Sequence, residues 1–363
     1  MQTAPLSRPT APLALPLDVA AHLGRFGLTL DSLLTDSNPK MAKGATLARS
    51  VILHHLPARA LAAAVTPGNQ GPTAPRAYLA ALAYLADREG LGPKARHWNG
   101  CPWATRGCAA GCLNWAGHGG LSADVAAARG RRTLAMIAAP HTYGRAVLWA
   151  IARQWARAQA AGLPLAVRLR GTDEGPAIGW HRLALTVTPA ESQALRLRFG
   201  LIVAPGDGVT HTLAAALAAP LQDGSLTLYD YSKAPLSGPL GLISLRAAGW
   251  DVTASLAADR PTAAADALAA LGAGFRLAVP VALDKGQPLP SALTLTTPGR
   301  PPLTVAAVDG DVSDHRWADP HGVAVILRTK ISRGADRALA DPFSLRPNAH
   351  PQALPDGVAT LSW

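Results

Sequence analysis

The chain has 363 residues, of which 49% are hydrophobic and 16% charged, a composition typical of a globular protein and too apolar for a disordered one. No apolar run approaches the roughly 20 residues that a membrane helix requires, and no basic start followed by an apolar core indicates a signal peptide. The formal net charge is +11, yet no long run of basic residues concentrates it. We therefore expect a cytoplasmic protein without membrane contact, whose diffuse charge supports only weak nucleic-acid binding.

The first half of the chain predicts a leader, one strand and three helices. Residues 1–37 are rich in proline and contain one short amphipathic segment, Leu17–Phe26, so we expect a flexible leader. A β-branched and apolar run indicates the strand. Apolar side chains at helical spacing indicate the helices, one of which has Ser122 as its N-cap. In chain order these elements are expected at Ser50–Leu53, Ala77–Arg88, Ser122–Ala139 and Gly144–Ala161.

Beyond Gly162 the pattern changes to short apolar runs that predict strands. Residues 180–220 are less regular, with strand-like pieces L-A-L-T-V-T and R-F-G-L-I-V and an alanine-rich helix near Thr212. Strands that alternate with helical connections imply an α/β fold with a mostly parallel sheet, open or closed into a barrel. The strands are expected at Leu165–Arg170, Leu226–Tyr231, Gly241–Arg246, Val252–Ser255, Phe275–Val281, Val305–Val308 and Val323–Arg328, with a helix at Ala263–Leu271.

Four of these strands end abruptly in polar residues, at R-L-R-G-T-D-E-G, L-Y-D-Y-S-K-A-P, I-S-L-R and A-V-D-G-D. Functional residues of parallel sheets gather where the strands end, so we expect these segments to form one site. Lys233 is a candidate catalytic residue that contacts a substrate; the alternative is a side chain whose stem covers apolar surface.

Asp309 is the second candidate catalytic residue. Together with Asp311 and Asp314 it has a spacing that suits Mg²⁺ or Ca²⁺. A metal there would make a nuclease or polymerase-like activity the rival hypothesis. The alternative is a turn in which aspartate side chains cap backbone amides, and the sequence does not decide between the two.

All three cysteines, Cys101, Cys108 and Cys112, lie within one loop rich in glycine, proline and tryptophan. An odd cysteine number without an export signal points to a reducing compartment, which disfavours a disulfide. Thiolates are soft ligands that select zinc or iron–sulfur clusters. Zinc would need a fourth ligand such as His118, whereas three cysteines can hold a cluster with one iron open. The remaining interpretation is three buried apolar side chains.

An early strand, a three-cysteine loop, helices and then a run of strands is an order that resembles radical S-adenosylmethionine enzymes. The resemblance implies a partial (β/α) barrel and a [4Fe–4S] cluster whose open iron binds S-adenosylmethionine. The G-T-D-E-G turn is similar to the family's Gly-Gly-Glu-Pro-like turn, so Asp173 or Glu174 would accept the cofactor's ammonium group. The cysteine spacing, C-x6-C-x3-C, differs from the family's usual C-x3-C-x2-C. The implied cofactor-binding residues are Gly171, Thr172, Asp173, Glu174, Ser244 and Arg246.

A second resemblance is to the gene product 88 domain of phages and plasmids, an uncharacterised family. Six motifs carry it in order: N-P-K-x-x-K-G, C-P-W-A-x-x-G-C-x-x-x-C-L-N, R-R-T, R-L-x-G-T, Y-D-Y-x-K and D-G-D-x-x-D-x-R-x-x-D-P. They begin at Asn38, Cys101, Arg131, Arg168, Tyr229 and Asp309. The resemblance places the domain at residues 38–335, leaves 336–363 as a tail, and implies no established activity.

The sequence thus predicts a partial (β/α) barrel of mostly parallel strands that carries a three-cysteine cluster and radical S-adenosylmethionine-like chemistry on an unspecified substrate. The alternative is a nucleic-acid-binding protein of a phage or plasmid, stabilised by zinc in place of the cluster.

Overall fold

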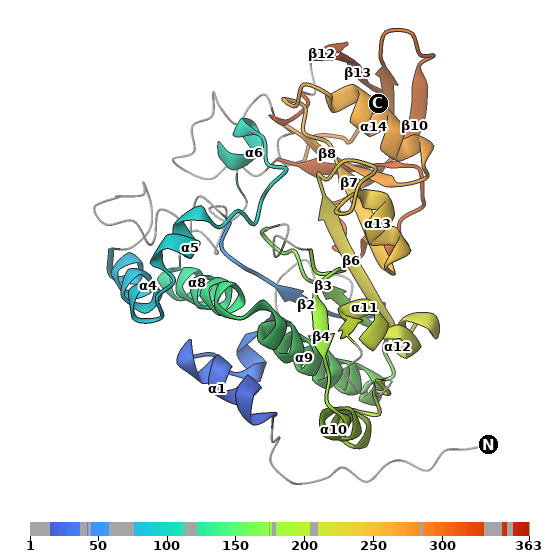
Figure 1. The fold of residues 1–363 in the computed structure, drawn as a ribbon. Helices are drawn as coiled ribbons and strands as arrows, with labels where there is room; N and C mark the ends of the chain where they lie inside the picture. The colour runs from blue at the N-terminus through green and yellow to red at the C-terminus, as the bar shows by residue number, and fades with distance from the viewer. Residues whose placement is uncertain are drawn as a thin grey trace, which may run out of the picture.

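The computed structural model describes residues 15–36, 42, 45–57, 76–110, 112, 122–173, 175, 179–203, 210–283, 286–329, 343–346 and 351–362. These residues form a mixed α/β fold around one large sheet (Figure 1). The sheet has 11 strands in the order β1-β2-β3-β6-β7-β8-β11-β10-β9-β13-β12, and β4 and β5 form a separate two-stranded sheet. The predicted α/β class is therefore confirmed, and the described strands form an open sheet rather than a closed barrel.

Seven neighbouring strands of the large sheet, from β2 to β10, are parallel. Antiparallel strands flank them on both sides, β1 on one and β9, β13 and β12 on the other. The strands are β1 (Leu34–Thr35), β2 (Arg49–Leu53), β3 (Leu165–Arg168), β4 (Ala184–Thr186), β5 (Thr210–Thr212), β6 (Leu226–Ser232), β7 (Trp250–Ser255), β8 (Arg276–Val281), β9 (Ala292–Thr296), β10 (Leu303–Asp309), β11 (Ala324–Arg328), β12 (Gln352–Leu354) and β13 (Gly357–Ser362).

Because the parallel strands share one direction, their last residues meet at a single edge, which we call the carboxyl edge. In the run β2-β3-β6-β7-β8 the order in the sheet follows the order in the chain, whereas β11 lies between β8 and β10. The loops after β2, β3, β6 and β7 are therefore neighbours at the carboxyl edge. This arrangement brings together segments that are far apart in sequence.

Helices connect several of these strands; in Figure 1 the long helix α9 runs beside β3 with α8 packed against α9, while α13 lies beside β7 and α14 beside β7 and β8. The helices are α1 (Leu17–Arg25), α4 (Arg76–Arg88), α5 (Gly92–His97), α6 (Arg106–Ala110), α8 (Ala123–Ala138), α9 (Pro140–Ala160), α10 (Pro189–Phe199), α11 (Leu213–Ala216), α12 (Ala218–Gln222), α13 (Leu242–Ala247) and α14 (Ala263–Gly272), with short 3-10 turns η1 (Leu30–Ser32) and η3 (Arg316–Ala318).

The two faces of the parallel sheet differ in chemistry because side chains alternate along each strand. One face packs into the main hydrophobic core beneath the helices, with Val51, Val167, Leu228, Ala254 and Val279. The opposite face, which we call the polar face, carries hydroxyl and charged side chains. Strand register places these side by side: Ser50 on β2, Arg168 on β3, Tyr229 and Tyr231 on β6, and Thr253 on β7.

Most predicted elements are confirmed, including the helix that begins after Ser122, whose hydroxyl accepts a hydrogen bond from the Val125 amide at 3.4 Å. Helix α9 begins four residues earlier than predicted, at Pro140, since proline is favoured in a first helical turn. The alanine-rich helix near Thr212 is α11, capped by the Thr212 hydroxyl.

Two predicted strands are wrong. The run Gly241–Arg246 contains helix α13, which the apolar alternation of a short six-residue piece could not exclude. In R-F-G-L-I-V, the first two residues end α10, and Gly200 closes that helix in the left-handed conformation with φ 73°.

The predicted leader and tail are more ordered than expected. Helix α1, which matches the amphipathic segment, buries Val19 and Leu23 in the main core, and β1 pairs with β2. In the predicted tail, β12 and β13 extend the sheet from β9. Within 15–36 and 351–362 the chain therefore belongs to the domain, because apolar side chains there complete its core.

Candidate functional site

The turn after β3 lies against the residues that follow β2. The Gly171 amide donates to the Leu53 carbonyl at 3.0 Å, and the Thr172 hydroxyl donates to the His55 carbonyl at 2.5 Å. A Cβ atom on Gly171 would lie 2.3 Å from the Nδ1 atom of His54, so only glycine allows this approach. The structure thus places Gly171 and Thr172 at the carboxyl edge, as predicted.

Asp173, in the same turn, is a buried carboxylate with few partners. Its side chain is fully buried, and its Oδ2 atom lies 3.4 Å from Nδ1 of His55. Neither carboxylate oxygen has a hydrogen-bond partner among the described residues. Glu174, the other predicted ammonium acceptor, lies outside the described residues. A buried carboxylate with open acceptor positions is suited to receive a cation.

The His55 ring connects Asp173 to Tyr143. Its Nε2 atom lies 3.2 Å from the Tyr143 hydroxyl, and its ring stacks on Trp180 with centroids 6.1 Å apart. Burial raises the pKa of Tyr143, so its hydroxyl stays protonated and can donate to Nε2. The Nδ1 side of the His55 ring faces Asp173. The three side chains form a buried chain from α9 to the turn.

Basic side chains surround His54 at the same edge. Burial, together with the charges of Arg129, Arg168 and Arg132, holds the pKa of His54 well below its usual value, so the imidazole is neutral. Arg132 donates from Nε to the Ser32 carbonyl at 2.7 Å and from Nη1 to the His54 carbonyl at 3.3 Å. Arg132 is therefore a buried side chain that fastens α8 to the exit of β2.

The cysteine loop is hydrogen-bonded to the loop after β7. The Thr105 hydroxyl donates to Oδ1 of Asp259 at 2.7 Å, and the Gly107 amide donates to Oδ2 at 2.8 Å. Arg260 donates from Nη2 to the Trp103 carbonyl at 2.7 Å. Because Asp259 and Arg260 follow β7, the cysteine loop is held at the carboxyl edge, two strands from the Gly171–Asp173 turn in the sheet order.

All three cysteines lie within the described residues, are half-buried, and are thiols rather than disulfide partners. The Cys108 amide donates to the Thr105 hydroxyl at 3.1 Å, which places Cys108 in the first turn of α6. Across the described residues, no three His, Cys, Asp or Glu side chains are gathered as a ligand set for a metal ion. His118, the predicted alternative zinc ligand, lies outside them.

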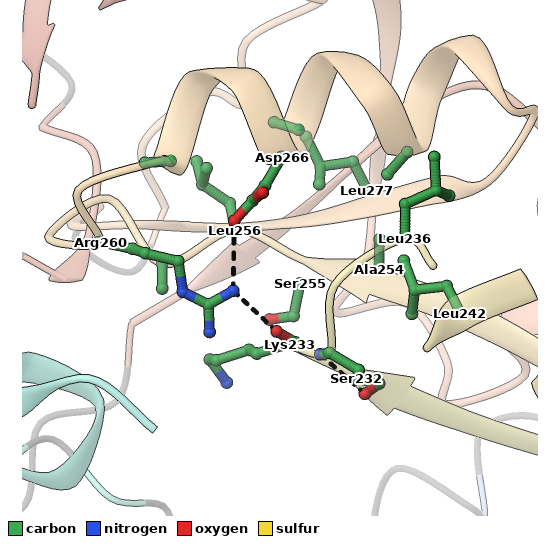
Figure 2. A pocket seen from close by; sticks show the side chains of 15 residues that line it. Ser232, Lys233, Leu236, Leu242, Ala254, Ser255, Leu256, Arg260, Asp266 and Leu277 are labelled. Carbon is green, nitrogen blue, oxygen red and sulfur yellow. Dashed lines mark hydrogen bonds and ion pairs between the residues drawn. The ribbon is translucent and has the colours of Figure 1, made fainter. Parts of the chain in front are cut away.

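Lys233 follows β6 and lies next to the cysteine loop through Arg260. Figure 2 shows Arg260 between Lys233 and Asp266, where its Nη1 atom donates to the Lys233 carbonyl at 2.7 Å and lies 3.4 Å from the Asp266 carboxylate. The Lys233 ammonium lies 5.3 Å from the ring centre of Phe343. Lys233, Arg260 and Asp266 line a small pocket beneath α14, together with Ser232, Leu236, Leu242, Ser255 and Leu256. Arg260 thereby joins the cysteine loop, Lys233 and α14.

The D-G-D motif after β10 forms a turn. The Asp309 carboxylate accepts from the Asp311 amide at 2.7 Å, and the Asp311 carboxylate accepts from the Arg328 amide at 3.2 Å. The Arg328 side chain lies 3.8 Å from Asp309 and 3.6 Å from Asp311. These contacts are those of the capping interpretation. Asp314, the third acid of the motif, instead lies against Arg168 at 3.9 Å.

Ser244 and Arg246 do not lie where the resemblance implied. Both are on helix α13, where the Ser244 hydroxyl donates to the Gly238 carbonyl at 2.7 Å. Arg246 donates to the Ala273 carbonyl at 3.0 Å and covers the Phe275 ring at 4.0 Å. Because Ala273 and Phe275 immediately precede β8, Arg246 lies at the opposite edge of the sheet. Its contacts are those of a structural residue, and its predicted place on a strand is wrong.

Sequence reasoning missed His55, Tyr143, Asp259 and Arg260. The pair His54-His55 directly after a predicted strand was a usable signal, because polar residues at strand exits are the rule for such sites. Tyr143 and Asp259 gave no signal, since each is brought to the site by tertiary contacts alone. In comparisons with known proteins, no family model, no curated protein and no solved structure matches this chain.

Proposed function

We propose that this chain is an iron–sulfur enzyme with radical S-adenosylmethionine-like chemistry. The observation that carries the proposal is the docking of the cysteine loop, which follows helices α4 and α5 after β2 and is fastened by Asp259 and Arg260 to the carboxyl edge. The buried carboxylate of Asp173 leaves the second parallel strand at the same edge. An iron–sulfur cluster with bound S-adenosylmethionine requires soft ligands for the iron and an acceptor for the cofactor's ammonium group, and these two loops offer both.

The donor set fits a cluster in its chemistry. Three half-buried thiols in one loop, with Trp98 and Trp103 packed on the adjoining core, offer sulfur ligands with partial protection from water. Cys101, Cys108 and Cys112 would hold three irons, and cluster binding would draw their sulfur atoms together. A cluster held there with one open iron would supply the electron for reductive cleavage of S-adenosylmethionine.

Asp173 would receive the ammonium group of that cofactor. Its two open oxygens, its complete burial and its place after β3 support this role. His55 would act as a positioning residue, because its Nδ1 side faces Asp173 and its Nε2 side is held by Tyr143. Lys233 is the nearest candidate among the predicted residues for contact with a substrate, since Arg260 ties its backbone to the cysteine loop.

The strand order also supports the proposal. The strands β2, β3, β6, β7 and β8 are parallel, lie side by side in chain order and are joined by helical connections, which is the arrangement from which a partial (β/α) barrel is built. The polar face would then be its inner surface. Membership of the phage and plasmid gene product 88 family remains part of this proposal and rests on the six sequence motifs.

The alternative, a zinc-stabilised nucleic-acid-binding protein, has less support. Several arginines that contribute to the net charge of +11 are engaged within the molecule instead of forming a phosphate-binding surface. Arg145 bridges Asp18 and Glu191, Arg153 pairs with Asp31, and Arg276 pairs with Asp251. Such pairs neutralise basic side chains locally.

The proposal is tested by assaying reductive cleavage of S-adenosylmethionine. Protein loaded anaerobically with iron and sulfide is mixed with dithionite as the one-electron reductant, and methionine and 5′-deoxyadenosine are measured. We expect both products, and we expect Asp173→Asn combined with Glu174→Gln to weaken cofactor binding while the cluster absorption is unchanged. Unchanged affinity in the double variant would refute the role of the turn. A loaded, reduced protein that binds no cofactor would refute the radical chemistry.

A further inference from the structure

The segment Val312–Trp317, between β10 and β11, covers the polar face of the sheet. The His315 Nε2 atom lies 2.7 Å from the Ser50 hydroxyl. The Trp317 ring lies over Tyr229 with centroids 4.9 Å apart. This segment therefore reaches from β2 to β6 and shields the polar face from water.

Beneath Val312–Trp317, several buried polar atoms have no hydrogen-bond partner among the described residues. Within the described residues these include the Tyr229 hydroxyl, the Thr253 hydroxyl, Nε of Arg168 and Nδ1 of His315. Tyr229, Thr253 and His315 are each 0% exposed, so water does not reach them from the surface. A buried hydroxyl without a partner costs free energy, and a polar ligand at the same place would recover it.

Asp314 supplies the negative charge that this surface requires. Its carboxylate lies 3.9 Å from Nη1 of Arg168, and Asp230 lies 3.7 Å from Nε of the same guanidinium. The Tyr231 ring, 4.7 Å away, holds the guanidinium from one face. Arg168 is thus a fixed cation at the end of β3, with Asp230 on one side and the carboxylate of the segment on the other. A guanidinium flanked by hydroxyl groups is a typical recognition element for carboxylate and phosphate groups.

We propose that the polar face binds the carboxylate or phosphate group of a small molecule, and that Val312–Trp317 is a lid whose Asp314 occupies that position in the closed form. The ligand's anionic group takes the place of Asp314 on Arg168, and its oxygen atoms accept from the Tyr229 and Thr253 hydroxyls. The proposal does not involve the cysteines or a metal, so it stands or fails separately from the proposed function.

The contacts of Val312–Trp317 allow the segment to move away from the polar face as one unit. Its internal hydrogen bonds include the Arg316 amide to the Asp314 carbonyl at 3.0 Å and the His315 amide to the Ser313 hydroxyl at 3.2 Å. The Arg328 amide anchors one end through Asp311, and Arg276 anchors the other through the Trp317 carbonyl at 3.1 Å and the Asp319 carbonyl at 2.8 Å. Between these anchors, the described polar contacts to the sheet are His315 to Ser50 at 2.7 Å and the ion pair of Asp314 to Arg168 at 3.9 Å.

Two measurements test the proposal on the full chain without added metal. Calorimetric titration measures the affinity for inorganic phosphate in one arm and for acetate in the other, which distinguishes the two anion classes. Limited trypsin digestion with mass spectrometry measures cleavage after Arg316, which is 1% exposed when the segment is closed. The variants are Arg168→Gln, Arg168→Lys and Asp314→Asn. Arg153→Gln and Asp31→Asn, from an ion pair on α9 and η1, are matched controls for the charge changes.

We expect Arg168→Gln to weaken anion binding about tenfold or more, as loss of a bidentate charged partner does, and Arg168→Lys to weaken it less. Asp314→Asn should tighten binding and speed cleavage after Arg316, because the competing carboxylate is gone. The controls should change neither measurement. Anion affinity that is equal in Arg168→Gln and the parent protein overturns the site. Weaker binding or unchanged cleavage in Asp314→Asn overturns the lid.

Discussion

The Thr105 hydroxyl lies 2.7 Å from the carboxylate of Asp259, although 154 residues separate the two in sequence. The second oxygen of that carboxylate accepts from the Gly107 amide at 2.8 Å. One aspartate thereby caps the short helix that carries Cys108 and fastens the cysteine loop to the exit of β7. The position of the cysteines relative to the carboxyl edge depends on this pair.

Asp259→Ala is expected to loosen the cysteine loop without unfolding the domain. The variant loses two hydrogen bonds to a charged acceptor, a loss of about 1.5–3 kcal/mol for each at most, and the loss is confined to the loop. Cys108 should therefore react faster with a thiol reagent such as dithionitrobenzoate. Asp223→Ala, which removes a comparable carboxylate bond to the Ser225 amide on a distant turn, should leave the thiol rates unchanged. Equal thiol rates in both variants would show that Asp259 does not hold the loop.

Gly171→Ala is expected to destabilise the domain. Its new Cβ would meet Nδ1 of His54 at 2.3 Å and Cγ2 of Ile52 at 2.7 Å, so the turn after β3 must move. Overpacking of this kind costs about 1–3 kcal/mol, measured by urea unfolding. Gly24→Ala is the matched control, because nothing lies within 4 Å of the added atom there and alanine favours the helix. A free energy of unfolding that is lowered equally in both variants would contradict the close approach at Gly171.

Stability should fall as the pH drops below about 6.5. Burial lowers the pKa of His22, only partly offset by its hydrogen bond to the Ala135 carbonyl at 3.0 Å. When the pH falls below the pKa that His22 has in the unfolded chain, the imidazole gains a proton in the unfolded chain before it does so in the folded one. Protonation therefore favours unfolding. One such group contributes a slope of up to about 1.4 kcal/mol per pH unit. His54, His181 and His315 share the direction of this shift.

His22→Gln isolates one part of this pH dependence, since glutamine can donate to the same carbonyl without titrating. Urea unfolding between about pH 7.5 and 5.5 should show a shallower loss of stability in the variant than in the parent protein. Parallel curves for the two proteins would mean that His22 is not protonated on unfolding in this range.

DNA binding should be weak and strongly dependent on salt. A net charge of +11 that is partly paired inside the molecule gives non-specific attraction, which counterion release reduces steeply as salt rises. Fluorescence anisotropy with short duplexes should detect binding at low salt and no binding at about 150 mM salt. Cys101→Ala should leave this binding unchanged. Sequence-selective binding that persists at that salt concentration would favour the nucleic-acid alternative.

The sequence predicted the sheet class, most helices and the location of two polar strand exits because these depend on local periodicity and capping. The runs at Leu226–Ser232 and Arg276–Val281 contain β-branched or aromatic side chains, which favour a strand. The run Gly241–Arg246 failed because its leucines favour a helix and its apolar pattern fits either state. Because this segment is a helix, Arg246 lies at the edge of the sheet opposite to the carboxyl edge, where it was predicted.

The contacts that build the candidate site could not be predicted from local pattern. Tyr143 reaches His55 across 88 residues, and Arg260 reaches Trp103 across 157. Both pairs follow from how α9 and the cysteine loop pack on the sheet, which is a tertiary property. Asp173 was identified because it follows a predicted strand, but its burial and its open oxygens became visible only in the fold.

Anaerobic loading with iron and sulfide, followed by absorption spectroscopy and metal analysis, tests whether the three cysteines hold a cluster. We expect a brown protein with a broad band at ~400 nm and about four irons and four sulfides per chain. Cys101→Ser, Cys108→Ser and Cys112→Ser should each lose that band, because three ligands serve one cluster. A colourless protein that holds stoichiometric zinc, or no metal at all, would rule out the iron–sulfur cluster.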